Sequence, residues 1–174
     1  MVEAAAASLL LACGGNVVAV TRRDPALMQV LKATGCEVVI HDHADDGMGT
    51  SIAAGVAASA GASGWVIALG DMPSIRVDTV MTVVDALRAG ARIVLPVVGG
   101  KRGHPVGFSA HYLPRLLALT GDTGAREILA ADASFIEETH VEDAGIFADI
   151  DTVADLKRHP FAEPPLGREG STNH

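Results

Sequence analysis

Apolar residues in this sequence follow two patterns that alternate along the chain. Some form short continuous runs rich in valine, isoleucine and leucine, which are typical of strands buried on both faces of a sheet. Others recur three and four positions apart, which is typical of helices that cover such a sheet with one apolar face. The alternation predicts an α/β fold, a Rossmann-like three-layer α/β/α sandwich with a mostly parallel sheet.

Capping residues and glycines set the ends of the predicted elements. Asp24 and Pro25 begin a helix, with aspartate as the N-cap and proline at the first helical position, and Gly35 ends it. The predicted helices cover residues 3–13, 25–34, 52–57, 77–87 and 112–119, with further helices opening at Asp122 or Thr123 and at Thr152. The predicted strands cover residues 17–20, 38–40, 65–69, 93–97, 106–109, 135–137 and 145–150.

The length of 174 residues fits one domain with a sizeable core. We expect this domain to cover residues 1–159, and residues 160–174, which are rich in proline, glycine and polar residues, to form a disordered tail. A doubly wound domain normally opens with a strand, and the loop after that strand binds phosphate. This chain opens with a helix. Either the domain is atypical, or its N-terminal strand and loop are missing.

Composition narrows the class of partner. Hydrophobic residues make up 49% of the chain but aromatic residues only 3%, so the core is expected to consist of alanine, valine, leucine and isoleucine. The formal charge is −8 without any run of lysine or arginine, which argues against nucleic acid or an anionic membrane as partner. Cys13 and Cys36 lack the spacing of a metal site and are expected to be free thiols, which favours a cytoplasmic protein. We expect neither a signal peptide nor a membrane span.

A polar turn follows the apolar run at residues 65–69 and begins Gly70-Asp71-Met72-Pro73. In open α/β sheets, ligands bind beyond the carboxyl ends of the strands. Asp71 is therefore placed where a carboxylate can hold a hard cation such as Mg2+. The same side chain can instead cap the helix that follows or take part in an ordinary turn, and its position alone favours neither interpretation.

Two glycine-containing segments can also reach a ligand. Residues 47–51 run into a helix whose N-terminus presents free N–H groups and two hydroxyls, so they can bind an anion or serve only as a cap. Residues 99–108 carry Lys101 and Arg102, either of which can reach a phosphate. The alternative for this second segment is an exposed hairpin tip.

A second aspartate, Asp151, ends the last predicted strand, and two carboxylates at one edge of a sheet can share a Mg2+ ion.

In chain order, the sequence holds GMGTSIAAGV, GDMPSI, GKRGHPVGF, GDTGARE and DIDTVADL. This set resembles the molybdenum-cofactor nucleotidyltransferases, the MobA-like group of the glycosyltransferase-A-type α/β fold. The similarity is greatest to the CTP:molybdopterin cytidylyltransferases, and it covers roughly residues 5–158.

The resemblance implies a role for each motif. Asp71 would be the main Mg2+ ligand and catalytic residue, and Asp151 the second. The residues that would contact the nucleotide are Gly49, Thr50, Ser51 and Gly70. The residues that would face the acceptor, the phosphorylated pterin of molybdopterin or molybdenum cofactor, are Met72, Pro73, Arg102, Gly103, His104 and Pro105. In the implied reaction, the terminal phosphate of the acceptor attacks the α-phosphate of CTP and pyrophosphate leaves. A molybdoenzyme would receive the product.

The sequence departs from this family at its beginning. Members open with a strand and the signature L-A-A-G-x-S-x-R-x-G followed by a lysine, which cradles the triphosphate. The stretch LLACGG at residues 10–15 looks similar, but neither Arg-x-Gly nor a lysine follows at the right distance. We therefore expect an opening β-loop-α segment, on the order of 30 residues, to be missing. The alternatives are a non-catalytic module that binds the cofactor and delivers it to a molybdoenzyme, and a GTP-using relative with another phosphorylated acceptor.

Overall fold

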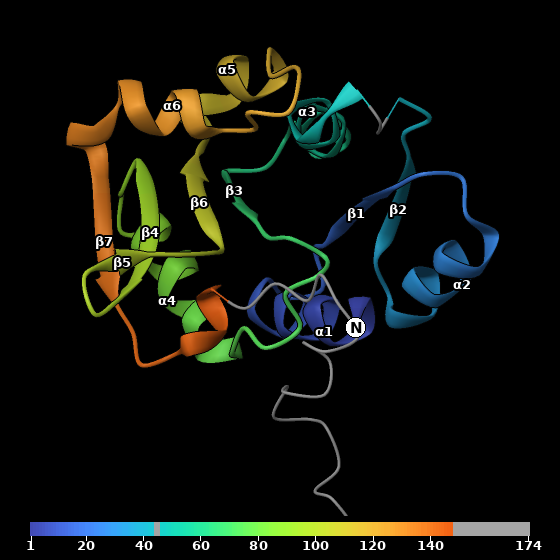
Figure 1. Cartoon of the computed structure of the whole chain (residues 1–174), viewed down its shortest axis with the longest axis horizontal. Coiled ribbons are helices and arrows are strands. Elements are labelled where there is room, and N and C mark those ends of the chain that lie inside the picture. Colours follow the sequence, from blue (N-terminus) through green and yellow to red (C-terminus); the bar gives the residue numbers. More distant parts are fainter. Residues whose placement is uncertain (44–45, 148–174) are drawn as a thin grey trace, which may run out of the picture.

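The computed structural model describes residues 1–43 and 46–147. Its elements alternate between helices and strands up to residue 98, as the apolar pattern predicts, and two further strands then follow without a helix between them (Figure 1). The helices are α1 (Val2–Ala12), α2 (Pro25–Thr34), α3 (Met48–Ala58), α4 (Val77–Arg88), α5 (Leu113–Leu117) and α6 (Arg126–Ala131), with 3-10 turns η2 (Ala110–Tyr112), η3 (Ala133–Phe135) and η4 (Ala144–Phe147). The strands are β1 (Val18–Thr21), β2 (Glu37–Ile40), β3 (Gly64–Ile67), β4 (Ile93–Val98), β5 (Lys101–Arg102), β6 (Val106–Ser109) and β7 (Ile136–His140).

The described strands form two sheets. β1 pairs with β2 in parallel, and a five-stranded sheet has the order β3-β6-β4-β5, with β7 also paired to β4. The expected α/β class is confirmed, and the β4–β7 pair is parallel as well. The pairs β3–β6, β4–β5 and β4–β6 are antiparallel, so this sheet is mostly antiparallel where the sequence predicts a mostly parallel one. The reason is that the chain reverses after β4 through a hairpin and then returns between β3 and β4.

Local signals set both ends of α2. The Asp24 carboxylate accepts hydrogen bonds from the N–H groups of Ala26 (3.0 Å) and Leu27 (3.1 Å), and Gly35 ends α2 in the left-handed conformation, so both predicted ends of this helix are confirmed.

Three predicted elements differ from the structure. α3 begins at Met48 rather than near residue 52, so residues 49–51 lie in its first turn and not in a loop. The helix predicted from Asp122 or Thr123 begins only at Arg126. The strand predicted at residues 145–150 is wrong over its described part, which is the 3-10 turn η4. There the Asp143 carboxylate accepts the Gly145 N–H (2.9 Å), an Asx turn that bends the backbone out of an extended conformation.

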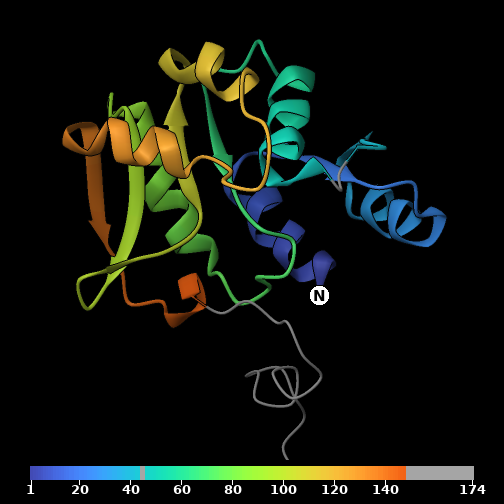
Figure 2. The ribbon, with the colours of Figure 1, turned by 45° about the horizontal axis from the view of Figure 1, so that its top comes forward.

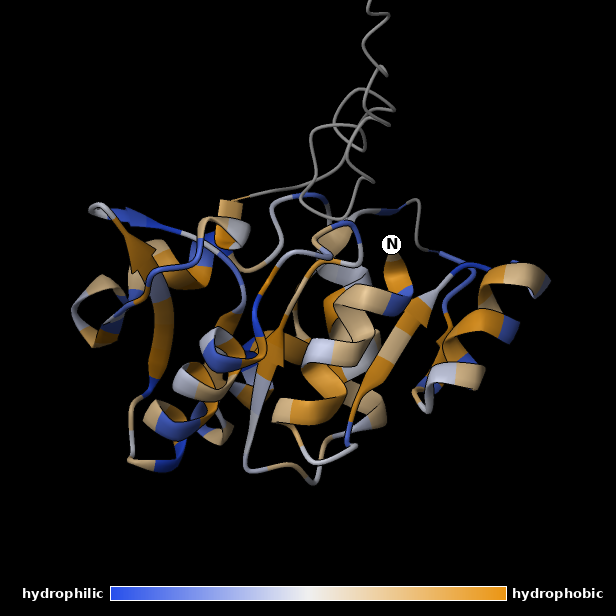
Figure 3. Cartoon of the chain, turned by 90° about the horizontal axis from the view of Figure 1, so that it is seen from below, coloured by the Kyte–Doolittle hydropathy of each residue, from blue (hydrophilic) through white to orange (hydrophobic). Residues whose placement is uncertain are grey.

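The main core lies where α3, α5 and α6 pack on the five-stranded sheet. Ile93, Phe108, Tyr112 and Leu116 are fully buried there, and the rings of Phe108 and Tyr112 meet edge to face. A second, smaller apolar cluster lies between α1, α4 and the turn after β3. Figure 3 shows apolar residues concentrated in the helices and strands and polar residues more frequent in the connecting loops.

A large cavity, about 1750 Å3 in volume, separates the two sheets. Residues of β1 and residues of β3 both line it. α1 packs against both α2 and α4, and α3 contacts β1, β2 and α5, so these two helices bridge the sheets (Figures 1 and 2). In the described part of the chain, β1 pairs only with β2 and β3 pairs only with β6. The cavity therefore lies between two strand edges.

Candidate nucleotide and metal site

Asp71 lies in the turn that follows β3, four residues after the last residue of that strand. Its side-chain oxygen Oδ1 is buried and has no hydrogen-bond partner among the described residues. A buried carboxylate oxygen without a donor is unfavourable unless something electropositive binds it. This oxygen therefore fits a bound cation, because a hard divalent ion takes carboxylate oxygens as ligands.

The turn around Asp71 is fixed by its neighbours. Met72 and Ile75 are only 2% and 5% exposed and pack in the smaller apolar cluster with Val80. The Ser8 hydroxyl of α1 donates a hydrogen bond to the Ile75 carbonyl (2.9 Å). The backbone that carries Asp71 is therefore held by this apolar packing and by the hydrogen bond from α1.

This packing changes what Met72 and Pro73 can do. Sequence reasoning placed both against the acceptor, but both side chains are buried. Any contact that they make with a ligand has to come from their backbone.

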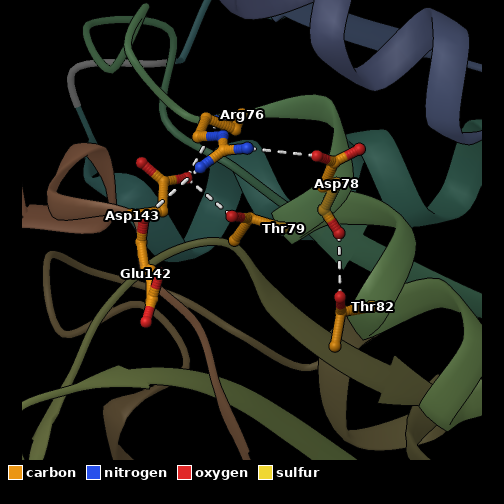
Figure 4. A network of polar contacts seen from close by, with 6 residues as sticks. All are labelled: Arg76, Asp78, Thr79, Thr82, Glu142 and Asp143. Carbon is orange, nitrogen blue, oxygen red and sulfur yellow. Dashed lines mark hydrogen bonds and ion pairs between the residues drawn. The ribbon is translucent and has the colours of Figure 1, made fainter.

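The helix after this turn receives its cap from a distant residue. Arg76, the N-cap of α4, makes no side-chain cap hydrogen bond to its own helix. The buried carboxylate of Asp143 instead accepts the Arg76 N–H (2.9 Å) and the Thr79 hydroxyl (2.6 Å), as Figure 4 shows. Sequence reasoning missed Asp143, because the residues that it contacts lie 64 and 67 positions earlier in the chain and no local spacing marks them.

The segment predicted to contact the nucleotide serves mainly to pack α3. The Gly49 N–H donates to the Gly121 carbonyl (2.8 Å), and a Cβ at Gly49 would lie 2.6 Å from the Thr120 carbonyl oxygen. The Thr50 hydroxyl donates to the Gly47 carbonyl (2.8 Å). Ser51 is the member of this segment that lines the large cavity.

The segment predicted to face the acceptor lies at the same cavity. Arg102, Gly103 and His104 line it, whereas Pro105 is buried behind them. Arg102 is held by Glu138 of β7, whose carboxylate lies 2.7 Å from its Nε. Glu138 is a second residue that the sequence did not single out.

The structure thus brings several predicted residues to one cavity. The members that line it are Ser51, Gly70, Arg102, Gly103 and His104. The GDTGARE motif also contributes to this lining, through Asp122, Thr123 and Arg126. The second predicted metal ligand, Asp151, lies outside the described residues. Within residues 1–43 and 46–147, no three histidine, cysteine, aspartate or glutamate side chains gather as a metal cluster.

No described helix combines the length and the apolar character that crossing a membrane requires.

Comparison with known proteins identifies a family. Residues 1–139 match the MobA-like NTP transferase domain. The nicotine blue oxidoreductase of Paenarthrobacter nicotinovorans is 28% identical over 167 residues, which is 91% of this chain and 81% of that protein. The purine catabolism protein PucB of Bacillus subtilis (strain 168) is 37% identical over 114 residues, which is 63% of this chain and 54% of that protein.

Solved structures share the fold. A nucleotidyl transferase from Methanothermobacter thermautotroptrophicus (Mth528) superposes with a TM-score of 0.76 at 22% identity, covering 90% of this chain and 77% of the other. Rv0371c from Mycobacterium tuberculosis H37Rv, in complex with manganese, superposes with a TM-score of 0.68 at 23% identity, covering 87% of this chain and 82% of the other. The α/β nucleotidyltransferase fold expected from the sequence is therefore confirmed.

Proposed function

Because this chain belongs to the MobA-like NTP transferase family, we propose that it transfers CMP from CTP to molybdopterin or molybdenum cofactor. A terminal phosphate oxygen of the acceptor attacks the α-phosphorus of CTP. The bond between the α-phosphorus and the bridging oxygen breaks, and pyrophosphate leaves with that oxygen. The choice of CTP and of the pterin rests on the five motifs found in the sequence.

The observation that carries the proposal is the buried Oδ1 of Asp71, which has no partner among the described residues. Asp71 itself does not line the cavity, but Gly70, the residue before it, does. Asp71 is the residue that would hold a divalent cation, Mg2+ in the reaction that we propose, with Asp151 as the second ligand. The Rv0371c complex with manganese supports a divalent ion in a protein of this fold. When bound, such an ion offsets the negative charge of phosphate oxygens.

The remaining site residues divide between the two substrates. The hydroxyl of Thr50 and the N–H of Gly49 are already bonded within the protein, so Ser51 is the hydroxyl of this segment that we assign to the nucleotide. Arg102 and His104 are assigned to the acceptor, on the other segment that lines the cavity. The ion pair with Glu138 orients the Arg102 guanidinium, which matches phosphate geometry in its planar donors.

We propose further that a strand and loop preceding α1 complete the domain. The cavity between the edges of β1 and β3 supports this expectation. A strand of five residues fills roughly 800 Å3, from a rise of about 3.3 Å per residue, about 4.8 Å between strands and about 10 Å between layers. The cavity has about 1750 Å3, which leaves space beside such a strand for part of a ligand. A strand that precedes α1 would form a βαβ unit with β1, in which the two strands are commonly neighbours.

The test is pyrophosphate release by the purified chain with Mg2+, molybdopterin, and either CTP or GTP. We expect release that requires CTP, the acceptor and the metal, with reactions that lack the acceptor or contain EDTA as controls. Pyrophosphate release with GTP but not with CTP would assign the chain to a relative that uses another nucleotide. Molybdopterin binding without release from either nucleotide would identify a delivery module instead. The same assay on a chain extended by its upstream codons tests the added strand, which should increase turnover.

A further inference from the structure

A short turn after β7 joins two segments that are far apart in the sequence. We call residues 143–147 the Asp143 turn, residues 70–76 the Asp71 loop, and residues 102–105 the His104 loop. The Asp143 turn contacts both loops through its carboxylate, its backbone and one apolar side chain.

The carboxylate of Asp143 holds the end of the Asp71 loop. It is 5% exposed, and its Oδ2 accepts the N–H of Arg76 (2.9 Å) and the hydroxyl of Thr79 (2.6 Å). Its Oδ1 accepts the N–H of Gly145 (2.9 Å). The negative charge lies at the N-terminus of α4, where the helix dipole favours it. Three donors from two segments therefore converge on one buried side chain. Figure 4 shows the two donors that come from Arg76 and Thr79.

The backbone of the turn adds contacts on both sides. Gly145 lies directly against the Ser74 carbonyl, so a side chain there would collide with the Asp71 loop. The Ile146 carbonyl accepts the N–H of His104 (3.0 Å). A Cβ at Gly103 would lie 2.6 Å from Ile146 Cγ1, so Ile146 packs closely on the His104 loop.

We infer that Asp143 is a positioning residue for the metal site, an inference that rests on the proposed function of Asp71. The Asp71 Oδ1 has no donor among the described residues to orient it, so the direction of the carboxylate depends on the backbone of its loop. That backbone is fixed at its far end by Asp143. Outer residues that orient a metal ligand typically change metal affinity about 10–100-fold when they are mutated. The Asp143 turn also links metal binding to the loop assigned to the acceptor.

A purely structural cap makes a different prediction. In that case, loss of the Asp143 carboxylate would lower the melting temperature and leave the affinity for metal unchanged in the folded protein. The two roles are therefore separated by measuring metal binding and stability on the same variants.

The test is a Mn2+ titration followed by the electron paramagnetic resonance signal of the free ion, in the presence of a non-hydrolysable CTP analogue. Asp143→Asn keeps the shape of the side chain and removes its charge. We expect its Kd for Mn2+ to rise about tenfold or more, as for other residues that orient metal ligands. Asp71→Asn should abolish this binding.

Asp132→Asn is the matched control. The Asp132 carboxylate also joins two donors, the Tyr112 hydroxyl (2.7 Å) and Arg115 (2.7 Å), but none of these three residues belongs to the Asp71 loop, the His104 loop or the Asp143 turn. We expect its melting temperature to fall and its Kd for Mn2+ to stay within about a factor of two, well below the change expected for an outer residue of a metal site.

If Asp143→Asn does not fold, Thr79→Val removes a single one of the three donors and should still weaken Mn2+ binding. An unchanged Kd in folded Asp143→Asn, or in Thr79→Val where the first variant fails, overturns the inference. If the wild-type protein itself does not bind Mn2+, the metal role of Asp71 is wrong, which is a failure of the proposed function and is seen before any variant is compared.

Discussion

Replacing Asp71 by alanine should remove activity without lowering stability. The Oδ1 of this side chain is buried without a donor in the described part of the chain, and leaving one polar atom in that state costs roughly 1–3 kcal/mol. Alanine removes this oxygen. We therefore expect the free energy of unfolding to stay the same or to rise by about 1 kcal/mol, which raises the melting temperature by about 2–4 °C for a chain of this size.

The assay measures the free energy of unfolding of Asp71→Ala and of a second aspartate variant by urea denaturation, without metal or nucleotide. Asp143→Ala is the contrast, because three donors lose their common acceptor, and we expect it to destabilise the fold by about 3 kcal/mol. Both variants are also tested for pyrophosphate release. Most substitutions destabilise a protein, by about 1 kcal/mol on average. A larger loss of stability in metal-free Asp71→Ala would show that the Asp71 carboxylate stabilises the fold. Wild-type turnover by the same variant would refute its metal role.

Three further predictions concern packing, protonation and the acceptor. Gly49→Ala should destabilise the fold by about 1–3 kcal/mol in urea, because its Cβ would press on the Thr120 carbonyl oxygen, whereas Gly61→Ala, which meets open space, should not. The hydrogen bond from the Tyr112 hydroxyl, followed by that from Arg115, lowers the pKa of Asp132. The ionised Asp132 carboxylate therefore stabilises the fold at pH values above the ordinary pKa of the group. The difference in melting temperature between wild type and Asp132→Asn should therefore shrink as the pH falls below 3.8 and through the lowered pKa. His104→Ala should raise KM for molybdopterin about tenfold, the equivalent of one hydrogen bond of about 1.4 kcal/mol, and leave KM for CTP nearly unchanged; equal increases would indicate a structural histidine.

Features that depend on neighbouring residues could be predicted from the sequence. The α2 helix is the clearest case, because Asp24, Pro25 and Gly35 act within a few positions of the ends that they set. Asp71 could be identified as a candidate because a strand end is visible in the apolar pattern. The α/β class follows from the same pattern. These inferences need no knowledge of which strands pair.

Features that depend on distant residues could not be predicted. The antiparallel pairs of β6 arise because the chain returns between β3 and β4, and apolar content alone does not specify that direction. Asp143 acts on residues more than 60 positions away, so nothing near it reveals its role. The family resemblance implied that Met72 faces the acceptor, yet its side chain packs into an apolar cluster that only the folded chain assembles.

The separation of the two sheets also has a consequence for how the molecule opens. Backbone amides exchange with solvent when the segment that holds them unfolds locally, and the free energy of that opening differs between parts of one fold. β4 pairs with β5, β6 and β7, and Ile93 and Val94 are fully buried, so its amides should exchange most slowly. The β1–β2 pair and α2 are joined to the rest mainly through α1 and α3. Residues 18–40 should therefore open as one unit, at lower free energy than the larger sheet, and a protease should cleave them before it cleaves the strands of that sheet.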